Sequence, residues 1–204
     1  MASEIQADKW SPSTGVAGTI GDSGDTFTVP SGATLTVASG ATITNSGTAT
    51  GFSSGDNTPA FQATLSANQS LSNETTTKIL CNTEDFDTDS AYDNTTNYRF
   101  TVPAGEGGKY CIYVKSRINA SGNSLHEHSY LYVRKNGSDV MSDYFSFQMN
   151  SGNAATHNFS FIHDLSAADY IEFYAYFRDV DSNTGSIGGG SGYTTVGAYK
   201  MIGL

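Results

Sequence analysis

The sequence predicts an all-β protein whose main part is a two-sheet sandwich of approximately ten strands. Of 204 residues, 26 are serine, 24 threonine and 22 glycine, whereas only 15 % are charged. This composition favours short strands and turns and excludes a long-helix protein. Many short segments alternate apolar and polar residues with period two, as strands with one buried face do. The aromatic content of 12 % is enough to build a core.

Residues 1–20 predict an extended arm that attaches the protein to a larger particle. The segment is polar and contains Ile5 and Trp10, the single tryptophan of the chain, before Ser11-Pro12-Ser13. Because such an arm has no core of its own, we expect Ile5 and Trp10 to dock on another protein. The alternative is a frayed terminus with an idle aromatic side chain.

Residues 21–55 predict a short stalk made of β-repeats. No charged residue occurs between Thr26 and Gly55, and Ser-Gly pairs at 31–32, 39–40 and 46–47 mark turns. Apolar residues alternate between these turns, at Phe27, Val29, Leu35, Val37, Ala41 and Ile43. Three short strands cannot bury such a face alone, so we expect three chains to pair around an axis. The alternative is a disordered Ser/Thr/Gly linker.

Residues 56–204 predict the sandwich, which forms a head domain large enough for one core. A strong hairpin signal, Asn136-Gly137, interrupts the pattern. The expected strands are 59–65, 78–82, 98–102, 109–118, 129–135, 156–163, 170–177 and 195–202. No convincing amphipathic helix occurs between them.

The order of landmarks in the head resembles the complement globular-head and tumour-necrosis-factor-like jelly roll. The landmarks are Pro59-Ala60-Phe61, Ile79-Leu80-Cys81-Asn82, Tyr98 to Gly105 followed by Gly108-Lys109-Tyr110, Leu131 to Gly137, and Asp169-Tyr170-Ile171. The sequence departs from the family pattern at Ala168, where the family has glycine, and in the last strand, which lacks Phe-x-Gly. The resemblance implies a jelly roll, a homotrimer with apolar and aromatic residues at its axis, and binding without catalysis.

The stalk has a second resemblance. Gly18 to Thr26, Pro30 to Leu35 and Asn45 to Phe52 look like a repeat common in fibre proteins of marine tailed bacteriophages. This implies a virion protein that is assembled in the host cytoplasm and contacts other virion proteins. The absence of a basic, apolar leader in the first 30 residues agrees with that expectation.

Charge and motifs exclude several other functions. The formal net charge is −10 and the cations do not cluster, so we expect no nucleic-acid partner. No apolar run approaches the ~18 residues of a membrane-spanning helix. We find neither a Gly-x-Ser-x-Gly elbow nor a phosphate loop, so an enzyme such as a glycan hydrolase is the weakest reading. We expect Cys81 and Cys111 to be buried thiols, although a bond between them stays open.

Two clusters resemble metal sites, although we expect no cofactor. Asp85, Asp87 and Asp89 have the spacing of a calcium loop but lack its glycine and final glutamate. The alternative is a solvated acidic loop. His126 and His128 fall on one face of an extended strand and, in a trimer, would form a three-fold ring around an ion. The alternative for them is a polar loop.

The leading hypothesis is a trimeric bacteriophage fibre whose head binds a host cell-surface glycan or protein. The ends of the head should adjoin the stalk, which leaves the loops at the other end for binding. We expect these loops to be 85–97, 119–128 and 179–193. The candidate ligand-binding residues are Tyr92, His126, His128 and Tyr193. The rival hypothesis is a capsid or tail decoration protein that stabilises the particle without binding a receptor, and the sequence does not separate a tail from a head location.

Overall fold

The structure is a computed structural model that describes residues 24–44, 46, 57–121, 126–147 and 152–202. The chain divides into two compact units, residues 1–52 and 53–204. We call the described part of the second unit the head.

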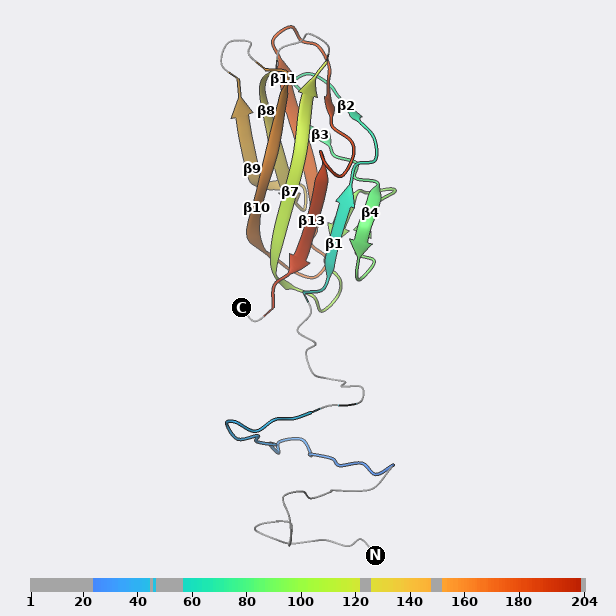
Figure 1. The fold of residues 1–204 in the computed structure, drawn as a ribbon, viewed down its shortest axis with the longest axis vertical. Coiled ribbons are helices and arrows are strands. Elements are labelled where there is room, and N and C mark those ends of the chain that lie inside the picture. The colour runs from blue at the N-terminus through green and yellow to red at the C-terminus, as the bar shows by residue number, and fades with distance from the viewer. Residues whose placement is uncertain (1–23, 45, 47–56, 122–125, 148–151, 203–204) are drawn as a thin grey trace, which may run out of the picture. The chain divides into compact units, whose positions relative to one another are not determined.

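The head is an antiparallel β-sandwich, as the sequence predicts (Figure 1). Sheet A consists of β1 (Ala60–Thr64), β2 (Gln69–Leu71), β4 (Thr83–Asp87), β7 (Gly108–Ala120), β10 (Ala154–Leu165), β12 (Gly185–Ile187) and β13 (Thr195–Lys200). Sheet B consists of β3 (Thr77–Lys78), β5 (Tyr92–Asp93), β6 (Arg99–Thr101), β8 (His126–Lys135), β9 (Ser138–Ser146) and β11 (Tyr170–Asp179).

The long strand β7 organises sheet A. It pairs with β10 along one edge, and with β13 and then β12 along the other. The sheet continues from β13 through β1 to β4, and from β12 to β2. In sheet B, β11 pairs with β8 on one edge and with β6 and β3 on the other, while β9 and β5 form the two outer edges.

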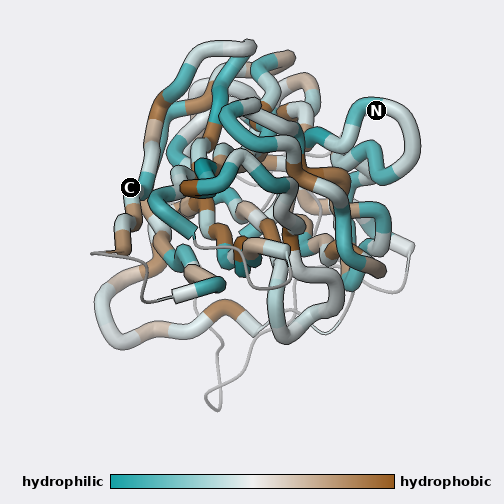
Figure 2. The backbone as a smooth tube through the Cα atoms, turned by 90° about the horizontal axis from the view of Figure 1, so that it is seen from above, coloured by the Kyte–Doolittle hydropathy of each residue, from teal (hydrophilic) through white to brown (hydrophobic). Residues whose placement is uncertain are grey.

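The core lies between the two sheets and follows the alternation of the strands. In β7 every second residue from Tyr110 to Ile118 is buried, and the residues between them point outward from sheet A. Phe61 anchors the core, with ring centroids 4.6 Å from Tyr92 and 5.0 Å from Phe100. Figure 2 shows hydrophilic and hydrophobic residues alternating along the tube, as one-sided burial requires.

The structure differs from the sequence prediction in several segments. The short strands β2, β4, β5 and β12 were not predicted. The expected strand 78–82 is a crossing between the sheets: β3 ends at Lys78, and the chain passes inward through buried Ile79 and Cys81 before β4 begins. Buried and exposed residues alternate in this segment because it crosses between the two sheets, although it belongs to neither sheet. Strand β9 was not predicted because it is a largely exposed edge strand whose apolar residues, Val140-Met141 and Tyr144-Phe145, lie in adjacent pairs and do not alternate with polar ones. The hairpin that leads into it is confirmed, with positive φ of 51° at Asn136 and 81° at Gly137.

The two ends of the head lie side by side. The backbone N–H of Lys200 donates to the carbonyl oxygen of Pro59 at 3.0 Å. Strand β7 runs away from this place, so that Asn119 near its end pairs with Ala154 at the start of β10. We call the end where β7, β9 and β11 finish the distal end (Figure 1).

In the first unit, the described residues 24–44 and 46 contain turns and no strand. Two turns close with backbone hydrogen bonds of 3.0 Å, from Ala33 to Pro30 and from Ala41 to Ala38. Their third residues, Gly32 and Gly40, have φ of 85° and 84°, the conformation that type II turns require there. The apolar residues between the turns, among them Phe27, Val29, Leu35, Val37 and Ile43, are exposed.

Candidate functional site

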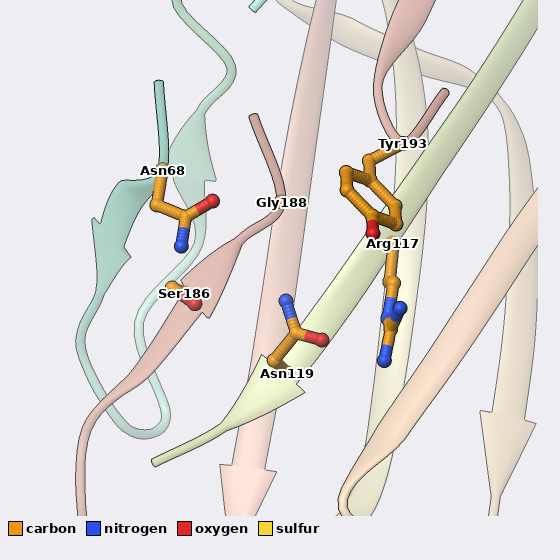
Figure 3. Close-up of a pocket in the computed structure, with 6 residues that line it drawn as sticks. All are labelled: Asn68, Arg117, Asn119, Ser186, Gly188 and Tyr193. Atoms are coloured by element: carbon orange, nitrogen blue, oxygen red, sulfur yellow. The ribbon is translucent and has the colours of Figure 1, made fainter. Parts of the chain in front are cut away.

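A polar pocket opens on sheet A near the distal end. Its volume is about 280 Å³, and we call it the distal pocket (Figure 3). It combines residues from β7, from β12 and from two loops that are far apart in the sequence. The lining residues are Asn68, Arg117, Asn119, Ser186, Gly188 and Tyr193.

The glycine-rich segment after β12 forms one wall of the pocket. Gly188 N–H donates to the carbonyl oxygen of Arg117 at 2.7 Å, and Gly189 N–H donates to Asn68 Oδ1 at 2.8 Å. A Cβ atom on Gly189 would come within 2.2 Å of the backbone of Ala67, so only glycine allows this approach. The glycines therefore hold the segment against the sheet. The chain then turns through Gly190, whose carbonyl accepts from Tyr193 N–H at 2.9 Å.

Arg117 gives the pocket an unpaired positive charge. Its guanidinium carbon lies 5.3 Å from the ring centroid of Tyr193, and among the described residues it has no ion pair. Lys115 also has no ion pair among the described residues. It is the next outward-facing residue of β7 after Arg117, in the direction away from the distal end. Their cross-strand partners on the neighbouring strands are the uncharged residues Thr156, Asn158 and Thr195. An anion at this place would therefore meet no described carboxylate on the paired strands.

The end of sheet A away from the pocket carries an exposed apolar row. Ile162 on β10 pairs with Cys111 on β7, and Cys111 pairs with Tyr199 on β13. Ile162 is 54 % exposed. We call these three residues the apolar row. Cys111 was expected to be buried but is half-exposed, because its odd position on β7 turns it outward, whereas Cys81 is buried and both are free thiols.

Beside the apolar row, Tyr113 lies across β13. A Cβ atom on Gly197 would come within 2.2 Å of the phenol of Tyr113, so the ring occupies the space that a side chain at Gly197 would need. The hydroxyl of Tyr113 donates to Gln62 Oε1 on β1 at 2.9 Å. Glycine at position 197 therefore keeps one aromatic ring of this face flat against the sheet.

The outward side of sheet B is covered with tyrosines. We call it the tyrosine face, and it consists of Tyr130, Tyr132, Tyr144, Tyr174 and Tyr176. Tyr130 stacks on Tyr132 with ring centroids 5.5 Å apart, and Arg134 lies 4.3 Å from the ring centroid of Tyr174.

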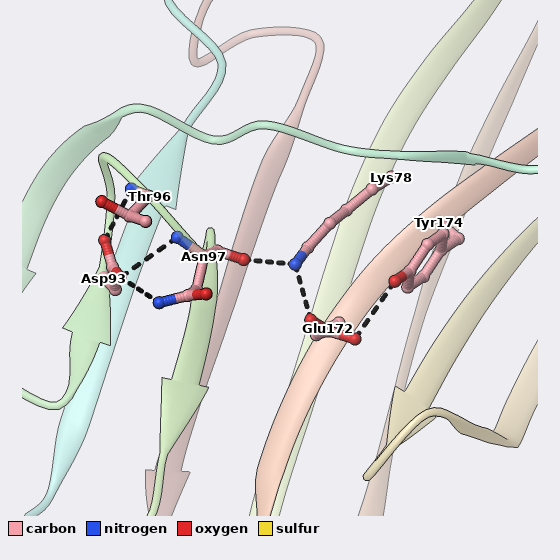
Figure 4. A network of polar contacts seen from close by, with 6 residues as sticks. All are labelled: Lys78, Asp93, Thr96, Asn97, Glu172 and Tyr174. Atoms are coloured by element: carbon pink, nitrogen blue, oxygen red, sulfur yellow. Dashed lines mark hydrogen bonds and ion pairs between the residues drawn. The ribbon is translucent and has the colours of Figure 1, made fainter.

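The charges next to the tyrosine face are paired (Figure 4). Lys78 Nζ is 2.5 Å from Glu172 Oε1 and also donates to the carbonyl oxygen of Asn97, while the Tyr174 hydroxyl donates to Glu172 Oε2 at 3.1 Å. Asp93 accepts the backbone N–H groups of Thr96 and Asn97 and so fixes the turn that presents Asn97. The backbone hydrogen bonds also hold the pKa of Asp93 well below its ordinary value.

Of the predicted ligand-binding residues, the structure brings only Tyr193 to the distal pocket, where it is 46 % exposed. The interpretation of Tyr92 was wrong, because its side chain is 5 % exposed and stacks on Phe61 in the core. Its hydroxyl donates to the carbonyl oxygen of Cys81 at 2.9 Å. The loop 85–97 also starts away from the distal end, since Thr88 N–H donates to Ala60.

The two histidines do not share a face. Strand β8 has a bulge at Glu127, so Arg178 pairs with His128 and Asp179 pairs with His126. His126 is 1 % exposed and packs between Phe147 and Phe177, whereas His128 joins the tyrosine face. The bulge therefore excludes His126 from surface contacts and separates the pair that a three-fold ring requires.

The predicted calcium ligands do not converge. Asp85 accepts from Gln62, Asp89 accepts from Thr88, and Asp87 accepts the backbone N–H groups of Asp89, Ala91 and Tyr92. Asp87 thus closes a turn. Within the described ranges, no three His, Cys, Asp or Glu side chains gather as a metal site would need. Ile5 and Trp10, the predicted attachment residues, lie outside the described residues.

Sequence reasoning missed Arg117, although the signal was present. In segment 109–118 the alternation that buries the even positions turns Arg117 and Lys115 outward. The remaining pocket residues could not be grouped in advance, because Asn68, Asn119 and Ser186 meet only through the pairing of β2, β12 and β7.

Comparison with known proteins supports the fold. No protein-family model matches the chain, and no curated protein matches its sequence. Among solved structures, Eiger TNF from S. frugiperda matches with a TM-score of 0.53 at 10 % identity, over 71 % of this chain and 93 % of that one. Murine APRIL matches with a TM-score of 0.53 at 12 % identity, over 70 % and 98 %. The head thus has a tumour-necrosis-factor-like jelly-roll fold. In the part that the structure describes, no helix is long and apolar enough to cross a membrane.

Proposed function

We propose that this chain is a homotrimeric fibre of a bacteriophage virion whose jelly-roll head binds the host surface. The observation that most directly supports this proposal is apolar surface that a single chain leaves uncovered in both units. In the first unit these are the repeat residues, and in the head it is the apolar row, in which Ile162 is exposed and Cys111 and Tyr199 are half-buried. Association through such surfaces is the usual reason for their exposure on a folded protein.

The repeats support association along the stalk. Phe27, Leu35 and Ile43 recur every eight residues, and each is more than half exposed. A disordered linker would not require apolar residues at such a regular spacing. Three copies side by side would supply one another with strand partners and with cover for these side chains.

The head supports association of the same kind. Ile162, Cys111 and Tyr199 form one cross-strand row, so a second copy can bury all three at once. The family resemblance of the sequence implies a trimer with such residues at its axis. In this proposal residues 1–20 attach the fibre to the virion, and the distal end of the head is left for a host glycan or protein.

Light scattering of the full chain tests the assembly. The parent should have three times the 21.6 kDa mass of one chain. Ile162→Asp places a charge in the apolar row and should shift the protein toward monomers, because an unpaired charge in an apolar interface is costly. Asn158→Asp is the matched control, since it adds the same charge on the same face of β10 outside the row. A parent that is monomeric at micromolar concentration would refute the trimer.

Adsorption separates host binding from decoration. Virions that carry the protein without residues 56–204 should stay intact and lose adsorption to host cells. Fragile virions with normal adsorption would instead identify a decoration protein. Removal of residues 1–20 should leave a folded trimer that no longer joins particles, and normal incorporation would refute the attachment role of Ile5 and Trp10.

A further inference from the structure

We propose that the distal pocket binds the carboxylate of an acidic sugar. This inference rests on the proposed function, because it names the class of host-surface glycan that the head would recognise. It starts from Arg117, the cation in the pocket, and from the neutral polar groups around it.

The charge around the pocket favours an anion from outside. The chain has a net charge of −10, and several described cations already contact a carboxylate, for example Lys109 with Asp164 and Lys200 with Glu106. Arg117 and Lys115 have no such contact among the described residues and follow one another on the outward side of β7. A ligand that brings one negative charge therefore complements this surface, whereas a cationic ligand would be repelled.

The chemistry of the lining favours a carboxylate over a phosphate. A guanidinium presents two parallel N–H groups that match the two oxygens of a carboxylate. The other lining groups are neutral, which suits a single charge better than the near-double charge of a phosphate. Asn68 Oδ1 is occupied by Gly189 N–H, so the amide nitrogen of Asn68 remains available as a donor.

The remaining groups suit the rest of a sugar ring. The amide of Asn119 and the hydroxyl of Ser186 can exchange hydrogen bonds with ring hydroxyls, and Tyr193 offers an aromatic face to ring C–H groups. Figure 3 shows these side chains arranged around one space, with Arg117 and Tyr193 on the same side. A volume of about 280 Å³ lies at the small end of ligand sites and suits one sugar residue. Three copies in a trimer would strengthen a weak single site through avidity.

Calorimetry with defined sugars and the full chain tests the inference. The probes are the methyl glycosides of glucuronate, galacturonate and N-acetylneuraminate, the methyl ester of the glucuronoside, methyl glucoside and glucose 6-phosphate. At least one acid should bind about tenfold more tightly than the neutral sugars, because charge-assisted hydrogen bonds are roughly twice as strong as neutral ones. Its binding should weaken as salt is raised, because ions screen a partly exposed pair.

Two variants locate the site. Arg117→Gln should weaken binding of the acid about tenfold without changing binding of the neutral sugars. Arg99→Gln is the matched control, because Arg99 also lies over a tyrosine ring, 4.3 Å from the centroid of Tyr170, and also lacks an ion pair among the described residues. It should leave binding unchanged. Circular dichroism and light scattering of both variants check that the fold and the assembly are kept.

The outcomes separate this inference from the proposed function. If no acid binds better than the glucuronoside ester, or if Arg117→Gln binds like the parent, the inference is wrong, although a trimer that mediates adsorption would still stand. If glucose 6-phosphate binds more tightly than every carboxylate, the pocket is a phosphate site and the carboxylate assignment fails. A monomeric parent that binds the acid through Arg117 would keep the pocket and refute the fibre.

Discussion

The outward faces of the two sheets differ in how far they satisfy their own side chains. On sheet B the cations Lys78, Arg134 and Arg178 each contact a carboxylate on the same side of the head. On sheet A, Arg117 and Lys115 have no ion pair among the described residues, and the apolar row is uncovered. These three cations of sheet B thus find carboxylates within one chain, whereas Arg117 and Lys115 on sheet A remain able to contact other molecules. Arg99 on β6 is the exception on sheet B, because it lies over the ring of Tyr170 and has no ion pair among the described residues.

This difference between the two faces predicts which substitutions should change the stability of the head and which should change its recognition of other molecules. Substitutions on the tyrosine face should lower the stability of the head, because they leave a partly buried partner unpaired. Substitutions in the apolar row or the distal pocket should change assembly or ligand binding with little effect on folding, because these groups gain little within one chain. The variants Ile162→Asp and Arg117→Gln test the second half of this statement.

The largest expected effect on stability comes from Glu172→Gln. This change leaves Lys78 opposite a neutral amide at a site where Glu172 is 8 % exposed, and we expect a loss of about 2–3 kcal/mol. Asp139→Asn is the matched control, since Asp139 pairs with Arg134 on the same face but is far more exposed, and it should cost less than about 1 kcal/mol. Urea unfolding of the full chain measures both. Equal losses would mean that burial does not distinguish the two pairs.

Between pH 6.5 and pH 4, acid should act on two buried histidines. Burial, followed by the charges of His157 and His128, lowers the pKa of His126 to about 4, and burial also lowers the pKa of His157. Asp179 opposes the shift at His126, and Asp143 opposes it at His157. An unfolded chain binds these protons near pH 6.5, so stability is full above that pH and decreases as pH falls toward 4.

The substitution His126→Phe checks this effect. We expect the parent to lose roughly 2 kcal/mol between pH 6.5 and pH 4 through His126. Phenylalanine fits between Phe147 and Phe177 and takes up no proton, so the variant should lose less over that range. His157 should still contribute a part of the loss. Thermal unfolding across the pH range measures the slope, and an unchanged slope would exclude His126 as its source.

The smallest effect should come from Gly197→Ala, which probes Tyr113, an aromatic ring on the outward face of sheet A that packs against its own chain. The new Cβ atom would displace Tyr113 and approach the carbonyl oxygen of Phe61 at 2.7 Å, so we expect a loss of about 1–2 kcal/mol. Gly192→Ala is the control, because a Cβ atom there would meet no atom within 4 Å. A neutral Gly197→Ala variant would show that Tyr113 is as free as the rest of this face.

Much of the fold was predictable from local pattern. The alternation in segment 109–118 predicted which residues of β7 are buried and which face outward. The pair Asn136-Gly137 predicted the hairpin between β8 and β9. Strand β9 was missed because its apolar residues lie in adjacent pairs and show no alternation with period two. Segment 79–82 was predicted as a strand because residues that cross between two sheets also alternate between buried and exposed positions.

The site was less predictable, because it depends on contacts between distant segments. Tyr193 and the distal position of loop 179–193 could be inferred from composition and chain order. His126 could not be placed, because the bulge at Glu127 reverses its face and leaves no mark in the sequence. Tyr92 looked like a loop residue, although its ring completes a stack with Phe61 that only the folded core reveals.

The glycine turns of the first unit make its length modular. Gly32 and Gly40 occupy equivalent places in two turns, and the apolar residues return to the same phase every eight residues. Duplication or deletion of one such unit keeps that phase. If these residues form strands in the trimer that we propose, a change of one residue would move all later apolar side chains to the opposite side. Under the proposed function, recombination within the repeat would then reset the distance between particle and head in whole steps, while the sequence of the head stays untouched.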